Sequence, residues 1–313
     1  MKIGFLFDGQ GSQYIGMGND LYDKYEAVRR TYKKVQELTG IDIAKISFHG
    51  PEDMLNMTKN TQLATVTECL AIVEILKGKN IEAVCSAGLS LGEYTALIGA
   101  GVFNFEDGIN LVKKRGEIMQ QLTPKGKWKM AAIIGLDDDS VTDICKSIDT
   151  GFVRPANFNT VGQVVISGEE EAVFKVSDIA KARGAKKISI LNTAGPFHTE
   201  KLEECSVALK NELDKINVER NGAKVVKNLD GVFYQGYDDM KKILAEHMKN
   251  PVKFSKCLQT MYDSGVDTFL EIGPGKVLSG FVKRMNFERK IKILNISDVN
   301  TLENAIREVF YYE

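Results

Sequence analysis

Short apolar runs alternate with helical patterns of apolar residues along most of the chain. Four short runs predict β-strands, and they lie at residues 2–7, 82–87, 267–272 and 290–296. Helical patterns begin at Leu91 and cover residues 105–121, 277–285 and 300–310. Strands that alternate with helices are typical of a mostly parallel sheet with helices on both faces, so the pattern predicts an α/β fold.

The middle of the chain has a different order of elements. Strand patterns lie at residues 130–136, 152–158, 163–167 and 185–191, and helical patterns lie at residues 137–148 and 169–183. The resulting order, βαββαβ, is ferredoxin-like. We therefore predict a small ferredoxin-like domain at residues 126–194, inserted into a discontinuous large domain of residues 1–125 and 195–313. The chain is expected to leave the small domain through Ala194.

Composition and charge narrow the class of protein. Hydrophobic residues make up 43% of the 313 residues and charged residues 27%, which is typical of a folded globular chain. The 41 Lys and Arg residues nearly balance the 42 Asp and Glu residues, so nucleic acid is not the expected partner. No apolar stretch approaches the ~18 residues of a membrane helix, and the first apolar run is too short for a signal peptide. We expect a cytoplasmic protein that does not bind membranes.

Cysteine and histidine are few. The five cysteines are scattered without a CxxC pair, which predicts reduced, buried thiols and neither a disulfide framework nor a metal site. The only histidines are His49, His198 and His247. A general base for neutral pH must come from these three or from a perturbed carboxylate, lysine or cysteine. His49 lies in a turn before a helix start, and we interpret it as structural.

A GxSxG motif, Gly88-Leu89-Ser90-Leu91-Gly92, carries the clearest chemical signal. It follows a predicted strand and opens a predicted helix, which is the context of a nucleophile elbow in an α/β-hydrolase-like domain. Its glycines allow a strained turn that exposes the Ser90 hydroxyl at a helix N-terminus, where backbone N–H groups can stabilise an oxyanion. The alternative is a glycine-rich turn between strand and helix that has no chemical role.

A second glycine-rich loop, residues 9–13, follows the first predicted strand. Its glycine spacing fits neither the Walker nor the Rossmann phosphate loop. Loops at the carboxyl ends of parallel strands share one crevice, so this loop is expected to face Ser90 and to supply a second oxyanion donor.

These motifs and others make the whole chain resemble the malonyl-CoA:acyl-carrier-protein transacylases, the acyltransferases of fatty-acid and polyketide synthesis. The further motifs are Lys114-Arg115-Gly116, Asn157-Phe158-Asn159, Gly195-Pro196-Phe197-His198 and Glu271-Ile272-Gly273-Pro274-Gly275. They occur in the order and spacing of that family.

The resemblance implies roles for individual residues. Ser90 corresponds to the nucleophile and His198 to the base that takes its proton. The backbone N–H groups of Gln10 and Leu91 correspond to the oxyanion hole. Arg115 corresponds to the residue that binds the malonyl carboxylate, and the planar guanidinium suits this task because it donates two parallel hydrogen bonds.

Three more positions are implied as substrate-binding or as part of the site. Asn159 lies in a family motif. Phe197 precedes the base and, in related polyketide acyltransferases, accompanies malonyl rather than methylmalonyl selection. His247 stands where the family usually has glutamine, and the backbone carbonyl there orients the catalytic histidine. Asp8 replaces a usual proline or alanine, and we expect its side chain to point away from the oxyanion hole.

The resemblance also implies the partners. The donor is the CoA thioester malonyl-CoA, and the acceptor is the phosphopantetheine thiol of an acyl carrier protein. No cofactor or metal is required, and a monomer is expected. Basic residues that could steer an acidic carrier protein are Lys113, Lys114, Lys181, Arg183, Lys186, Lys187, Lys283 and Arg284.

Two other functions remain open at this point. A serine acyl hydrolase or thioesterase of the same fold would use the same elbow, although a hydrolase of neutral acyl groups does not need Arg115. An inactive scaffold that docks a carrier protein is the non-enzymatic alternative, and the departures at Asp8 and His247 are the features that favour it.

Overall fold

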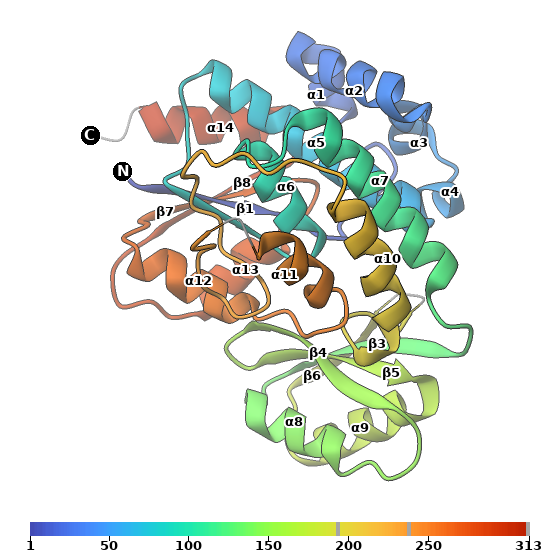
Figure 1. Cartoon of the computed structure of the whole chain (residues 1–313). Coiled ribbons are helices and arrows are strands. Elements are labelled where there is room, and N and C mark those ends of the chain that lie inside the picture. Colours follow the sequence, from blue (N-terminus) through green and yellow to red (C-terminus); the bar gives the residue numbers. More distant parts are fainter. Residues whose placement is uncertain (192–194, 237–238, 311–313) are drawn as a thin grey trace.

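The computed structural model describes residues 1–191, 195–236 and 239–310 and contains two separate sheets (Figure 1). The first sheet is parallel, has the order β2-β1-β7-β8 and consists of β1 (Ile3–Phe7), β2 (Cys85–Gly88), β7 (Thr268–Ile272) and β8 (Lys292–Ile296). Ala194, the expected exit from the small domain, lies outside the described residues.

The second sheet is antiparallel and has the order β4-β5-β3-β6. Its elements are β3 (Trp128–Ile134), α8 (Asp138–Lys146), β4 (Val153–Thr160), β5 (Gln163–Glu169), α9 (Glu170–Ala182) and β6 (Lys187–Leu191). This order is ferredoxin-like. The predicted fold class, a parallel α/β unit with an inserted ferredoxin-like βαββαβ unit, is therefore confirmed.

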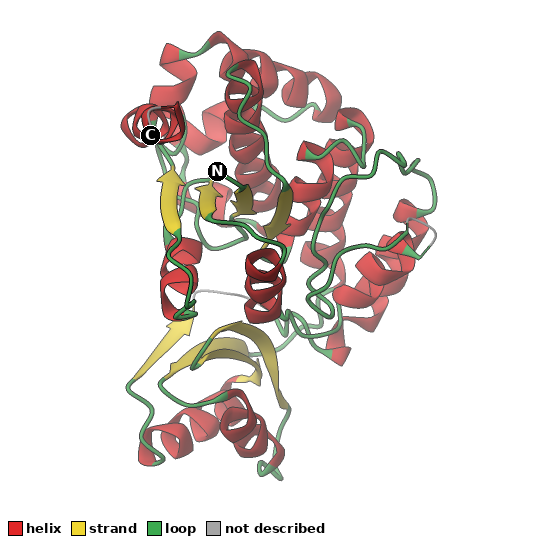
Figure 2. Cartoon of the chain, turned by 90° about the vertical axis from the view of Figure 1, so that its left-hand side faces the viewer, coloured by secondary structure: helices red, strands yellow, loops and turns green. Residues whose placement is uncertain are grey.

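The small sheet is covered differently on its two faces. Helices α8 and α9 lie on the face that is turned away from the parallel sheet (Figures 1 and 2). Ala131 and Ile133 of β3 belong to the apolar cluster under these helices, whereas Met130 and Ala132 line a cavity toward the other unit. Because side chains of a strand alternate between faces, β3 serves both surfaces at once.

Helices surround the parallel sheet. In chain order they are α1 (Asn19–Lys24), α2 (Glu26–Thr39), α3 (Ile43–His49), α4 (Glu52–Asn56), α5 (Thr58–Gly78), α6 (Leu91–Gly99), α7 (Phe105–Leu122), η1 (Glu200–Leu202), α10 (Glu203–Leu213), α11 (Met240–His247), α12 (Phe254–Asp263), α13 (Val277–Arg284) and α14 (Val299–Phe310). In the described part of the chain, no helix has the length and apolarity that crossing a membrane requires.

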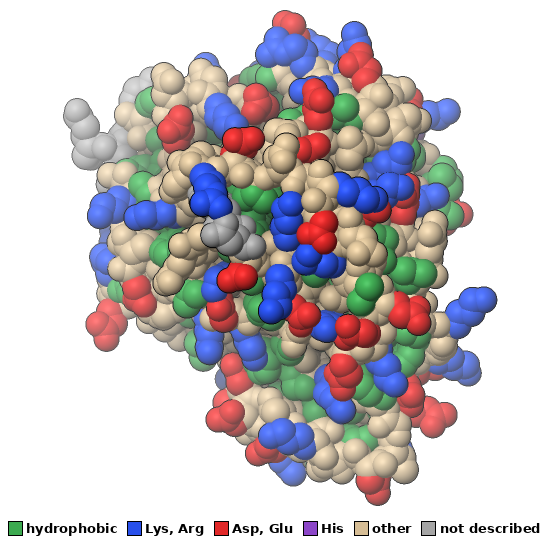
Figure 3. Space-filling model, in the orientation of Figure 1, with side chains coloured by type: hydrophobic (Ala, Val, Ile, Leu, Met, Phe, Trp, Pro, Cys, Tyr) green, Lys and Arg blue, Asp and Glu red, His purple; other side chains and the backbone are tan. Residues whose placement is uncertain are grey.

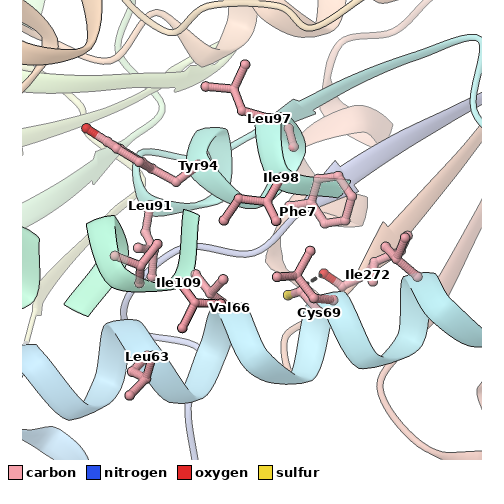
Figure 4. Close-up of a cluster of buried hydrophobic side chains, with 14 of the residues drawn as sticks. Phe7, Leu63, Val66, Cys69, Leu91, Tyr94, Leu97, Ile98, Ile109 and Ile272 are labelled. Atoms are coloured by element: carbon pink, nitrogen blue, oxygen red, sulfur yellow. Dashed lines mark hydrogen bonds between the residues drawn. The ribbon is translucent and has the colours of Figure 1, made fainter. Parts of the chain in front are cut away.

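Helix α5 is buried on nearly all sides and forms the centre of the core. Figure 4 shows Leu63, Val66 and Cys69 of α5 beneath side chains of β1 and α6. The Cys69 thiol donates a hydrogen bond to the Ile272 carbonyl at 3.2 Å, which ties α5 to β7. Burying Phe7, which is 1% exposed, stabilises the fold by roughly 1.5–3 kcal/mol.

Elements that were predicted differ from the observed ones mainly at their ends, whereas helices α1 to α5 and α10 to α12 were not predicted. The strand predicted from residue 82 begins at Cys85. Residues 82 to 84 are apolar in part, but Val84 is exposed, and the sheet pairing starts only where both faces become buried. All five cysteines are free and buried, as predicted.

Candidate active site

Ser90 lies on a sharp turn between β2 and α6, in a backbone conformation that serine rarely adopts (φ 53°). The flanking glycines are required because the chain passes too close for side chains. A Cβ at Gly88 would lie 2.0 Å from the Gly92 carbonyl carbon, and a Cβ at Gly92 would lie 2.2 Å from the Phe7 oxygen. The predicted elbow is therefore present, with the serine at a helix N-terminus.

Asn228 supports this turn from a loop far along the chain. Its side-chain oxygen accepts a hydrogen bond from the Ser90 backbone N–H at 2.7 Å, and its amide donates to the Gly88 carbonyl at 2.9 Å. Asn228 is fully buried, so these bonds replace contacts with water. Sequence analysis missed Asn228, because no local pattern announces a contact that spans 138 residues.

His198 is placed against Ser90. Its Nε2 lies 2.7 Å from Ser90 Oγ, and its Nδ1 lies 3.2 Å from the carbonyl oxygen of His247. A carbonyl only accepts, so Nδ1 carries the proton and Nε2 is free to accept the Ser90 proton. Burial, together with the positive charges of His247 and Arg115, holds the pKa of His198 well below its usual value of 6.5. The ring is therefore an uncharged base at neutral pH.

Arg115 reaches the nucleophile from α7. Its Nη1 donates to the Gln62 side-chain oxygen at 2.7 Å, and its Nη2 donates to Ser90 Oγ at 3.3 Å. The guanidinium stacks over the Tyr94 ring, with 5.0 Å between Cζ and the ring centroid, and is only 2% exposed. None of the described carboxylates forms an ion pair with this buried cation, which is therefore prepared to receive an anion. Sequence analysis missed Gln62, although an amide in the middle of an otherwise apolar buried helix is itself unusual.

A cavity of about 470 Å³ opens in front of Ser90, between the parallel unit and the small sheet. Its lining residues are Asp8, Gly9, Gln10, Gly11, Ser12, Gln13, Glu52, Asn56, Leu89, Ser90, Arg115, Met119, Met130, Ala132, Asn157, Asn159, Gln163, Val165, Leu191, Phe197, His198, Val277, Leu278 and Phe281. The volume is of the order that holds a small organic ligand. Phe197 and Asn159 both contribute to this wall, as do the two catalytic candidates.

The oxyanion candidates flank the nucleophile. A Cβ at Gly9 would lie 2.5 Å from the Leu89 carbonyl oxygen, so the loop after β1 packs directly on the elbow. Within the described residues, neither the Gln10 nor the Leu91 backbone N–H donates to another protein group. The Gln10 side chain accepts a hydrogen bond from Gln62 at 3.4 Å, which links this loop to the partner of Arg115.

Asp8 is buried next to this loop. Its Oδ2 accepts a hydrogen bond from the Gly275 backbone N–H, on the turn between β7 and α13. The carboxyl group is thus directed toward that turn, as expected. Burial and the neighbouring Glu271 carboxylate raise the pKa of Asp8 well above its usual value. The raised pKa favours the uncharged form of Asp8, and that form does not repel an anion.

His247 lies at the end of α11 and is 1% exposed. Its backbone carbonyl contacts His198, as the resemblance implies, and its ring also stacks on the His198 ring at 4.9 Å between centroids. The third histidine, His49, is exposed at the end of α3 and is not part of this cluster. Among the described residues, no group of three or more His, Cys, Asp or Glu side chains is arranged to hold a metal ion.

The surface does not concentrate one sign of charge on the face drawn in Figure 3, where basic and acidic side chains are interspersed. Several basic candidates already have partners. Lys113 donates to the Thr39 carbonyl at 2.9 Å, and Lys114 forms an ion pair with Glu117 at 3.1 Å. These two lysines are therefore weaker candidates for a steering surface than their sequence position indicates.

Comparisons with known proteins agree with this geometry. The family model described as acyl transferase domain matches residues 4–305. The chain is 39% identical to a malonyl CoA-acyl carrier protein transacylase of Bacillus subtilis, covering 98% of this chain and 96% of the relative. It is 35% identical to the enzyme of the same name from Staphylococcus aureus, covering 97% of both chains.

Solved structures give the same result. The fold matches a malonyl CoA-acyl carrier protein transacylase of Clostridium perfringens with a TM-score of 0.93 and 41% identity, covering 99% of this chain and 97% of the other. It also matches a malonyl-transacylase solved in complex with a type II polyketide acyl-carrier protein, with a TM-score of 0.93, 35% identity, and coverage of 98% and 100%.

Proposed function

The chain belongs to the acyl transferase family, among the malonyl CoA-acyl carrier protein transacylases, and from this premise we propose that it transfers the malonyl group of malonyl-CoA to the phosphopantetheine thiol of an acyl carrier protein. The observation that carries the proposal is the buried Arg115 guanidinium, which lies 3.3 Å from Ser90 Oγ and has Gln62 as its side-chain partner. This arrangement suits an acyl group that ends in a carboxylate.

The first half of the reaction loads the enzyme. Ser90 Oγ attacks the thioester carbonyl while its proton passes to Nε2 of His198, 2.7 Å away. The N–H groups of Gln10 and Leu91 stabilise the tetrahedral oxyanion. The intermediate collapses when the carbon–sulfur bond breaks, and the leaving CoA thiolate takes the proton from His198. The product is a malonyl ester on Ser90.

The second half of the reaction transfers the malonyl group from Ser90 to the carrier protein. The carrier thiol gives its proton to Nε2 of His198, and the thiolate attacks the ester carbonyl. The bond to Ser90 Oγ then breaks, and Oγ takes the proton back. The carbonyl of His247 keeps Nδ1 protonated throughout, so the same nitrogen, Nε2, serves both steps.

Arg115, Phe197 and Asn159 select and orient the substrate in this proposal. Arg115 binds the malonyl carboxylate and so fixes the thioester carbonyl over Ser90, which is catalysis by proximity. The Phe197 ring occupies space that a methyl branch on the malonyl carbon would need. Asn159 is buried with its side-chain oxygen free of hydrogen bonds to described residues, so it accepts one from an amide of the pantetheine arm.

The remaining assignments belong to the same proposal. Ser90 and His198 supply nucleophile and base, so the reaction needs no metal or cofactor. The protein acts as a cytoplasmic monomer, with an acyl carrier protein as its partner and without nucleic acid or membrane. The chain divides into a discontinuous large domain, residues 1–125 and 195–313, and a small domain, residues 126–194, and substrate binds between them.

A two-stage transfer tests this function. The protein is incubated with malonyl-CoA, freed of CoA by rapid gel filtration, and then mixed with phosphopantetheinylated acyl carrier protein. We expect the enzyme to lose the malonyl mass of about 86 daltons and the carrier protein to gain the same mass. Release of free malonate without carrier loading would identify a hydrolase. Carrier binding without any acyl transfer would identify a docking scaffold.

A further inference from the structure

His247 contacts the candidate base through two different groups. Its backbone carbonyl accepts the hydrogen bond from His198 Nδ1 at 3.2 Å. Its imidazole ring stacks on the His198 ring with an interplanar angle of 30° and 4.9 Å between centroids. Any residue at position 247 supplies a backbone carbonyl. The carbonyl alone therefore does not account for a side chain that stacks on the His198 ring.

The His247 ring is itself held by a buried carboxylate. Its Nδ1 lies 3.1 Å from Oε2 of Glu93, and the two side chains are 2% and 1% exposed. The other carboxylate oxygen, Oε1, accepts a hydrogen bond from the Tyr234 hydroxyl at 2.7 Å. Glu93 lies on α6 one turn beyond Ser90, and its N–H bonds to the Ser90 carbonyl at 3.2 Å. Nucleophile and carboxylate therefore belong to one rigid turn.

Burial strengthens the electrostatic effect of the contact between Glu93 and His247. A carboxylate that is removed from water is costly unless a cation or hydrogen bonds compensate it. Tyr234 provides a hydrogen bond, and a proton on His247 would provide the positive charge. Of the other titratable or charged groups nearby, Arg115 on α7 acts on His198, and Tyr94 on α6 and Cys257 on α12 lie near Glu93.

We propose that His247, paired with Glu93 and stacked on His198, is a positioning residue that fixes the plane of the catalytic ring and keeps that ring uncharged until Ser90 releases its proton. The proposal rests on the transferase function stated above. A positive charge on His247 disfavours a proton on the His198 ring that stacks against it. The Glu93 carboxylate offsets the charge that appears on His198 during each transfer step.

The test compares pH profiles of four proteins: wild type, His247→Gln, Glu93→Gln and the double variant. Glutamine at 247 keeps the backbone carbonyl and a side-chain donor but cannot carry a charge or stack as a ring. The acidic limb of kcat/KM for malonyl-CoA reports protonation of the free base. We expect His247→Gln to move this limb upward by about one pH unit, because a unit charge is removed beside His198.

Glu93→Gln separates an indirect role from a direct one. If Glu93 acts through His247, its loss frees the His247 proton and moves the limb upward too, and the double variant resembles His247→Gln. If Glu93 acted directly on His198, its loss would move the limb downward, and the two effects would add. His49→Gln, on an exposed histidine, is the matched control and leaves the profile unchanged. An unchanged limb in His247→Gln overturns the proposal.

An NMR titration of the ring nitrogens covers the case in which a variant fails to fold, and it does not depend on activity. Because the chain has three histidines, comparison with His49→Gln identifies the His49 signals and leaves those of the two buried rings. We expect one buried ring to stay in the neutral Nδ1–H form well below pH 6.5 and its signals to change when the neighbouring ring titrates. If the signals of the two buried rings change with pH independently of each other, the proposal is wrong. If malonyl-CoA never labels the wild type, the proposed function fails while this readout remains valid.

Discussion

Two clusters of buried titratable side chains differ in the way burial acts on them. The catalytic cluster consists of Ser90, Glu93, Arg115, His198 and His247. The carboxylate cluster consists of Asp8, Glu68 and Glu271 with the thiol of Cys69. The first cluster combines a carboxyl group, a guanidinium and two histidines, whereas the second contains only acidic groups.

The carboxylate cluster resolves its repulsion by protonation. Glu271 accepts backbone N–H bonds from Leu278 and Ser279, both at 2.8 Å, at the start of α13, where negative charge is favoured. Asp8 accepts one backbone N–H bond, from Gly275, but burial outweighs it, and Glu68 accepts none from the described residues. Burial raises the pKa of Glu68 to about 8, and neither of its oxygens has a hydrogen-bond partner among the described residues.

The comparison shows which of the two clusters keeps a buried charge beside Ser90. The catalytic cluster retains a buried cation, Arg115, that an anionic substrate can neutralise. In the carboxylate cluster, the raised pKa values of Asp8 and Glu68 favour their uncharged forms, so Asp8 opposes that anion less although it lines the same cavity. Substitutions in the catalytic cluster should therefore change activity, and substitutions in the carboxylate cluster should change stability.

The largest expected effect is that of His198→Ala. Removing the base should lower kcat by about 10³–10⁴-fold, because proton transfer from Ser90 is lost. Steady-state transfer to a carrier protein measures this effect, with the exposed His49→Ala as control. A loss below about tenfold would mean that another group takes the Ser90 proton and would remove His198 from the catalytic cluster.

Gln62→Ala should have an intermediate effect. The variant frees Arg115 Nη1 and lets the guanidinium move away from Ser90. We expect kcat/KM for malonyl-CoA to fall by about 10-fold, which corresponds to the loss of one hydrogen bond to a charged group of about 1.5 kcal/mol. Gln120→Ala, an exposed glutamine on α7, should leave kcat/KM unchanged. Equal effects in both variants would contradict the role of Gln62.

Glu68→Gln should change stability rather than activity. The folded-state pKa lies above the unfolded value, so the neutral carboxyl stabilises the fold below about pH 4.5, and this contribution is lost as the pH rises toward 8. Glutamine has no such loss. Relative to wild type, the free energy of unfolding of the variant should therefore rise with pH, by up to about 1.4 kcal/mol per pH unit between these limits.

Urea unfolding at pH 5 and pH 8 measures this difference. The matched control is Glu74→Gln on the same helix, where the side chain is 50% exposed and no dependence of this kind is expected. A Glu68→Gln difference that is constant with pH would mean that Glu68 is ionised in the fold and that the carboxylate cluster is not held neutral.

The two clusters also differ in how far the sequence predicts them. Ser90 was predictable because its turn is made by local glycines between a strand and a helix. The fold class followed from alternating patterns of strand and helix and is confirmed. His198 and Arg115 were placed at the site only by the family resemblance, since nothing local to either residue points to Ser90.

Residues that act through distant contacts were missed. Asn228 meets the Ser90 turn across 138 residues, and Gln62 meets Arg115 across 53 residues. Glu68 has the sequence context of an ordinary polar residue on a helix. Its burial follows from the packing of α5 on all sides, which depends on how helices and sheet assemble rather than on any local pattern.

Intact-protein mass after incubation with malonyl-CoA tests the central claim most directly, run beside acetyl-CoA and with an Arg115→Ala variant. We expect one malonyl adduct on Ser90, none from acetyl-CoA, and loss of the malonyl adduct in the variant. Equal adducts from both donors that persist in Arg115→Ala would contradict it, because the buried guanidinium would then not select the substrate.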